Sequence, residues 1–70
     1  TNYNPSELLA RINRVAGIDS VYSPSARYVR DKQNPNKTFF VFDATIRKDY
    51  NIYSVISSLE KQKILSDVGA

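Results

Sequence analysis

The sequence lacks the residues with which small proteins most often bind metals or form covalent links. Its 70 residues include no Cys, no His and only two Gly. Without Cys the chain has neither a disulfide nor a thiolate ligand, and without His it lacks the commonest metal ligand and the usual proton shuttle at neutral pH. Two isolated glycines, Gly17 and Gly69, cannot form a phosphate-binding loop. We therefore expect a protein without enzymatic activity, metal, cofactor or evident small-molecule ligand.

Length and charge indicate what type of protein domain the chain forms. We expect residues 1–70 to form one small α+β domain, either complete or a fragment of a larger chain. A domain of this size buries only about 60% of its unfolded surface and is marginally stable. The net charge of +3 is typical of a soluble surface of mixed charge. No apolar run approaches the roughly 20 residues that span a bilayer, and no signal-peptide pattern is present, so we expect no membrane partner; the compartment, cytoplasm or virion, is left open.

Residues 4–17 carry the signals of a capped amphipathic helix. Asn4 is a favourable N-cap, Pro5 suits the first helical position, and Glu7 falls where a capping box places an acid. Gly17 suits the positive φ with which many helices end. The apolar residues that follow helical spacing between these signals are Leu8, Leu9, Ile12, Val15 and Ala16.

Two strands are predicted next, over residues 20–30 and 38–47, joined by a turn-rich loop at 31–36. They are expected to pair as a long antiparallel hairpin. Pro24 cannot donate to a ladder, so the first strand is predicted to be an edge strand or to carry a bulge there. In the second strand, alternation places one set of residues on the core face and the other on the opposite face. The core set is Phe40, Phe42, Ala44 and Ile46, and the opposite set is Phe39, Val41, Asp43 and Thr45.

A second helix is predicted from Asn51, or from Asp49 if that residue is the cap, to about Gln62. A short strand over residues 64–68 follows, which gives the order α-β-β-α-β. The residues that we predict to form the core are Leu9, Ile12, Val15, Phe40, Phe42, Ile46, Val55, Ile56 and Leu59.

Residues 2–21 and 49–68 share a pattern of Tyr-Asn, amphipathic helix and short strand. One strand added before Tyr3 would give β-α-β-β-α-β, the ferredoxin-like split βαβ order, whose two halves are each βαβ. The predicted fold is therefore ferredoxin-like without its first strand. Because that strand is central, its absence leaves unpaired edges, and such edges pair with another chain or aggregate. We expect the sheet to be completed by a strand from a partner, from a second copy of the chain or from another segment of the parent protein.

Aromatic residues indicate where such a partner would bind. Phe39, Val41, Tyr22 and Tyr28 are predicted to form an exposed patch, because aromatic-rich patches mark interaction surfaces. Partial burial in the core is the alternative explanation for the same residues.

Nucleic-acid binding is the alternative function. Arg27, Arg30, Lys32 and Lys37 would line a hairpin able to contact phosphate. The run from Lys37 to Phe42 resembles the octapeptide of the RNA-recognition domain, which reads bases with aromatic residues on its central strands. It departs from that pattern where a small residue is expected and at Asp43, which stands at the last aromatic position. Solubilisation of an exposed hairpin accounts for the basic residues equally well.

A resemblance to one family lies at the first helix-to-strand junction. The run Ser6 to Ile12, followed by Gly17 to Tyr22, resembles a pattern in phage contractile-tail baseplate wedge proteins, where a helix ends in Gly-Ile or Gly-Val and a strand follows at once. ACT-like and other regulatory ferredoxin-like domains show the same pattern. The resemblance implies a structural segment of a large assembly with no catalytic residues to carry over. A small-molecule sensor of the ACT type is a third reading.

Overall fold

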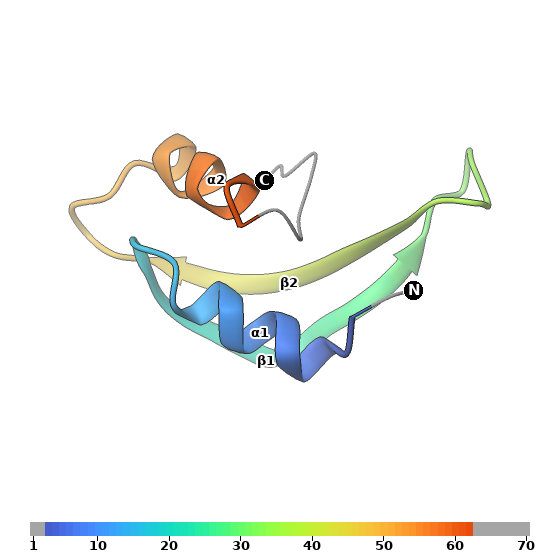
Figure 1. Ribbon diagram of the computed structural model, residues 1–70, viewed down its shortest axis with the longest axis horizontal. Coiled ribbons are helices and arrows are strands. Elements are labelled where there is room, and N and C mark those ends of the chain that lie inside the picture. Colours follow the sequence, from blue (N-terminus) through green and yellow to red (C-terminus); the bar gives the residue numbers. More distant parts are fainter. Residues whose placement is uncertain (1–2, 63–70) are drawn as a thin grey trace.

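The computed structural model describes residues 3–62 and shows a small α+β arrangement of two helices and one antiparallel hairpin (Figure 1). The order α-β-β-α agrees with the prediction, while the predicted strand at 64–68 lies outside the described residues. The elements are α1 (Pro5–Asn13), β1 (Ile18–Arg30), β2 (Thr38–Ile46) and α2 (Ile52–Glu60).

Both helices begin at the predicted Asn caps. The Asn4 side chain accepts a hydrogen bond from the Ser6 N–H at 2.9 Å, and the Asn51 side chain accepts one from the Tyr53 N–H at 2.7 Å. Each cap satisfies a backbone donor that has no partner within its helix. Asp49 is not the cap of α2. Helix α1 ends at Asn13, earlier than the apolar pattern predicts, and α2 ends at Glu60.

The turn after α1 depends on Gly17, whose φ of +95° lies in the left-handed region. A Cβ at this position would lie 2.6 Å from the Tyr50 ring and 2.7 Å from Val55. Glycine is therefore required both for its backbone conformation and for the close approach of the residues that begin α2.

The hairpin is antiparallel and contains the bulge that Pro24 predicts. Tyr22 is opposite Asp43 and Arg27 is opposite Val41, so residues 23–26 of β1 lie opposite the single residue between those partners in β2. Ser25 bridges this irregularity: its Oγ accepts a hydrogen bond from the Asp43 N–H at 2.7 Å and donates one to the Tyr22 carbonyl at 2.6 Å. A side chain thus replaces a ladder hydrogen bond where the strands lose register.

The core lies between the helices and one face of the hairpin. The predicted residues Ile12, Val15, Val55 and Leu59 are buried in it. Five of the nine predicted members are only half-buried. Phe40, Phe42 and Ile46 pack against the buried cluster, whereas Leu9 and Ile56 lie outside it and Leu8 takes the buried position on α1. Ile18 is buried as well, because it begins β1 directly after the turn. The half-buried hydrophobic residues that pack against this cluster are Val21, Tyr28, Phe40, Phe42, Ala44 and Ile46.

The helices cover only part of the hairpin. Both lie toward the end where β1 begins and β2 ends, and the loop between the strands projects well beyond them (Figure 1). One face of the hairpin therefore carries the core at one end, and the opposite face carries no described helix or strand. This arrangement determines which surfaces of the sheet remain available.

Candidate functional site

The first available surface is the outer edge of β2. The Lys37 carbonyl accepts a hydrogen bond from the Asp31 N–H at 2.9 Å, and the Arg47 N–H donates one to the Gly17 carbonyl at 2.7 Å. Between them, the Asp43 N–H donates one to the Ser25 Oγ at 2.7 Å. The backbone groups of Lys37, Asp43 and Arg47 therefore point toward the β1 side of the hairpin. Successive residues of a strand direct their N–H and C=O groups to opposite sides, and these three are odd-numbered. The even-numbered residues from Thr38 to Ile46 therefore direct their backbone N–H and C=O groups away from β1. Because residues 3–62 contain only a two-stranded sheet, we call this row the open edge of β2.

The open edge of β2 lacks the features that usually protect an edge strand. Proteins discourage edge pairing with Lys, Pro, bulges or short strands. Thr38–Ile46 runs for nine residues and contains no Lys, Arg, Pro or Gly, with Asp43 as its single charge. The outer edge of β1 differs, because it carries Pro24, the 23–26 bulge and three charged residues. The two edges of one hairpin are thus unequal, and the edge of β2 is the one suited to pairing.

The second available surface is the face of the hairpin opposite the core, which we call the uncovered face. Cross-strand partners share a face, so the pairs Val29–Phe39, Arg27–Val41 and Tyr22–Asp43 define it. Tyr22 is 63% exposed, while Val29 and Phe39 are each exposed by about two-fifths. The predicted patch residues Phe39, Val41 and Tyr22 are therefore brought together on this face.

Tyr28 lies on the other face from the rest of the predicted patch. Its ring packs edge-on against Phe40, with centroids 5.2 Å apart, and its hydroxyl donates a hydrogen bond to the Tyr3 carbonyl at 2.6 Å. Simple alternation would place Tyr22 and Tyr28 on one face, because their positions differ by an even number. The bulge between them reverses the alternation, so Tyr28 joins the α1 side of the sheet.

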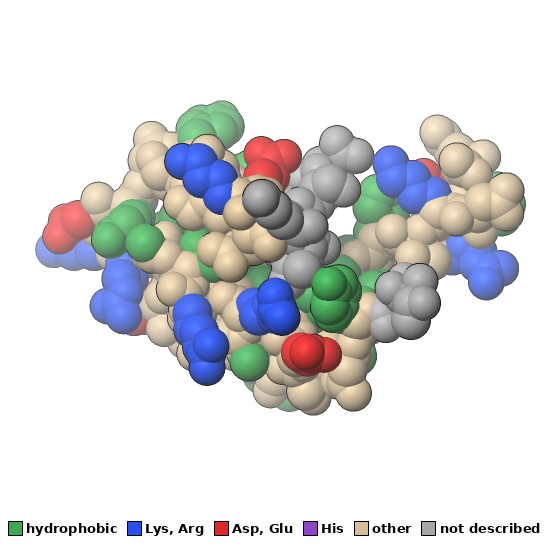
Figure 2. All heavy atoms as spheres, viewed as in Figure 1, with side chains coloured by type: hydrophobic (Ala, Val, Ile, Leu, Met, Phe, Trp, Pro, Cys, Tyr) green, Lys and Arg blue, Asp and Glu red, His purple; other side chains and the backbone are tan. Residues whose placement is uncertain are grey.

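The four basic residues predicted to contact phosphate do not share one face. Arg27 and Lys37 are on the side of the uncovered face, Arg30 pairs with Thr38 on the side of the core, and Lys32 lies in the loop. Arg27 donates a hydrogen bond to the Ser25 carbonyl at 2.7 Å, and the Lys37 ammonium lies 5.2 Å from the centre of the Phe39 ring. In the view of Figure 2, Lys and Arg side chains are spread along the length of the molecule rather than gathered into one patch.

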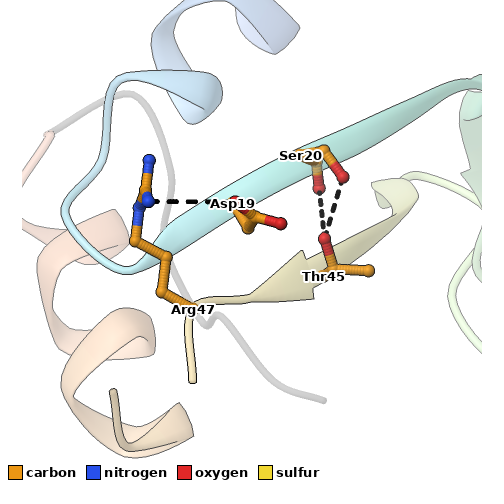
Figure 3. A network of polar contacts seen from close by, with 4 residues as sticks. All are labelled: Asp19, Ser20, Thr45 and Arg47. Atoms are coloured by element: carbon orange, nitrogen blue, oxygen red, sulfur yellow. Dashed lines mark hydrogen bonds and ion pairs between the residues drawn. The ribbon is translucent and has the colours of Figure 1, made fainter. Parts of the chain in front are cut away.

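A polar network joins the start of β1 to the end of β2 (Figure 3). The hydroxyls of Ser20 and Thr45 lie 2.8 Å apart, and the Arg47 guanidinium lies 3.8 Å from the Asp19 carboxylate. Both charged side chains are more than half exposed, and exposed pairs of this kind contribute about 0–1 kcal/mol. The network helps to hold the register of the strands, and it has no feature of a catalytic site.

The described residues offer no metal site, because no group of three His, Cys, Asp or Glu side chains comes together within positions 3–62. Neither α1 nor α2 is long and apolar enough to cross a bilayer.

Comparisons with protein-family models, with characterised proteins and with solved structures find no match to this chain. The resemblance to baseplate wedge proteins therefore stays a prediction, and the open edge of β2 and the uncovered face are the features from which a function can be argued.

Proposed function

We propose that this chain is a non-enzymatic structural module that associates with other protein by accepting a strand along the open edge of β2. The observation that carries this proposal is the nine-residue strand whose outer backbone groups pair with no strand among residues 3–62. In β-augmentation, main-chain hydrogen bonds supply affinity, and alternate side chains supply specificity. The open edge of β2 offers main-chain hydrogen-bonding groups along its full length.

The half-buried core face of β2 supports the same function. Phe40, Phe42, Ala44 and Ile46 all point toward the helices, yet none of them is fully buried. A neighbouring strand lies about 4.8 Å away in a sheet, so an added strand would cover the exposed parts of these side chains. The added strand would then carry apolar residues at every second position, facing the helices.

The same addition would complete the predicted fold. A strand added antiparallel to β2 runs parallel to β1. In a split βαβ fold, the first helix connects two parallel strands of this kind, so the added strand would take the place of the strand that precedes α1. The proposal is therefore consistent with a ferredoxin-like architecture, and a place in a large assembly is what the resemblance to baseplate wedge proteins implies. Nucleic-acid binding has less support, because the basic side chains are divided between the two faces.

Residue-resolved amide hydrogen exchange tests whether the edge is open. In the folded monomer we expect the amides of Phe40, Phe42 and Ala44 to exchange about tenfold or more faster than those of Val41 and Asp43, because only the second set is hydrogen-bonded within the hairpin. Equal protection of the two sets would show that the chain already covers this edge, and the proposal would fail. Rapid exchange of both sets would also count against it, because the hairpin itself would then not be formed.

A further inference from the structure

The open edge of β2 is complementary to a second copy of itself. When two copies pair antiparallel over all of Thr38–Ile46, Thr38 of one copy is opposite Ile46 of the other, and Phe40 is opposite Ala44. Phe42 is opposite Phe42 on the two-fold axis. All of these residues direct their backbone groups to the open edge, so they form hydrogen-bonded pairs in this register.

We propose that two copies of this chain join through β2 to form one continuous sheet of four strands, in the order β1-β2-β2-β1. This inference rests on the proposed function and names the partner that accepts the edge. A two-stranded ribbon is marginally stable in water, whereas three or more strands with a packed face are stable. Pairing of this kind removes both open edges at once, because the contact uses the same surface of each copy.

The charges along β2 favour the full-length register. Asp43 is the only charged residue in Thr38–Ile46, and the register centred on Phe42 places it opposite Val41 of the second copy. A register shifted to centre on Asp43 would place two carboxylates directly opposite each other, which is destabilising. On the core face, the paired residues are Thr, Phe, Ala and Ile, so no charge is buried when the strands meet.

The position of the helices also suits this arrangement. Each pair of helices lies toward one end of the hairpin and leaves the loop end uncovered (Figure 1). The two-fold axis at Phe42 reverses the strand direction and keeps the core faces of both copies on the same side of the sheet. The helices of the second copy would therefore lie toward the end of the first hairpin that its own helices do not cover. The Phe40 side chain of each copy, which is half-buried in the single chain, lies toward this uncovered end of its own hairpin.

Single-cysteine variants test both the partner and the register, because the chain contains no Cys of its own. Val41 and Asp43 of opposite copies would form a non-hydrogen-bonded pair with Cα atoms about 4.5 Å apart, within the range of about 4.4–6.8 Å that a disulfide accepts. Chains carrying Val41→Cys are mixed with chains carrying Asp43→Cys and oxidised slowly. We expect the mixed disulfide dimer in several-fold excess over its statistical share.

A matched control uses Val41→Cys with Thr45→Cys, which are diagonal neighbours about 7–8 Å apart in the proposed register. We expect this mixture to give no excess of mixed dimer. Statistical proportions in both mixtures, or no disulfide dimer in either, would overturn the pairing of two copies. That failure is distinguishable from failure of the proposed function, because exchange of the edge amides in the monomer decides the latter independently.

Discussion

Replacement of Ile12 by Ala is expected to unfold a large fraction of the molecule. Ile12 is 1% exposed and lies at the centre of the cluster formed by α1, β1 and α2. Truncation of a buried Ile to Ala costs about 2–5 kcal/mol through lost burial and the cavity that remains. Domains of this size have little stability in reserve. Urea unfolding followed by circular dichroism would measure the loss as a lower midpoint.

Leu9→Ala is the matched control for this prediction. It removes a side chain of the same size from the same helix, but Leu9 is half-buried and lies outside the buried cluster. We expect its cost to be about half that of Ile12→Ala or less, because less apolar area returns to water. Equal losses of unfolding free energy for Ile12→Ala and Leu9→Ala would mean that α1 does not pack as described.

Replacement of Gly17 by Ala is the second change with a large expected effect. The backbone φ of +95° disfavours any side chain, and the new Cβ would lie 2.6 Å from Tyr50 and 2.7 Å from Val55. Backbone strain of this kind costs about 1–3 kcal/mol, and overpacking adds about 1–3 kcal/mol. We expect a combined destabilisation of about 2–5 kcal/mol in urea unfolding, together with displacement of the start of α2.

The double variant Gly17→Ala with Tyr50→Ala separates the two causes. Removal of the Tyr50 ring relieves one of the two clashes but leaves the backbone strain and the contact with Val55. The two substitutions should therefore be non-additive, with the double variant more stable than the sum of the single effects predicts. Strict additivity, or a cost for Gly17→Ala below about 0.5 kcal/mol, would contradict the described turn.

Local signals in the sequence predicted much of this architecture. Asn4 and Asn51 were identifiable as caps because their side chains satisfy donors a few residues away, and such short-range bonds leave clear sequence patterns. The hairpin is predictable because its signal is also local: turn residues lie between two segments rich in strand-forming residues. Pro24 also indicated the irregularity in β1, because proline cannot take part in a regular ladder.

Features that depend on long-range packing were less predictable. Leu8 and Leu9 both fit a helical stripe, and only the direction from which β1 and α2 pack on α1 decides that Leu8 is buried. The faces of Tyr22 and Tyr28 depend on how many residues the bulge inserts, which the sequence does not specify. The sequence therefore predicts one surface for the four patch residues, whereas the described hairpin divides them between two faces.

The solution mass of three forms of the chain tests the central claim that β2 associates through its open edge. Ala44→Pro removes a backbone donor from the open edge, whereas Ala44→Ser keeps that donor and changes the side chain little. Pairing with Val21 is retained in both, because the Ala44 amide points away from β1. Circular dichroism would confirm that both variants fold, and sedimentation over a concentration series would give their masses. We predict dimers for the original chain and for Ala44→Ser, and a monomer for Ala44→Pro. The same mass for all three forms would contradict the account.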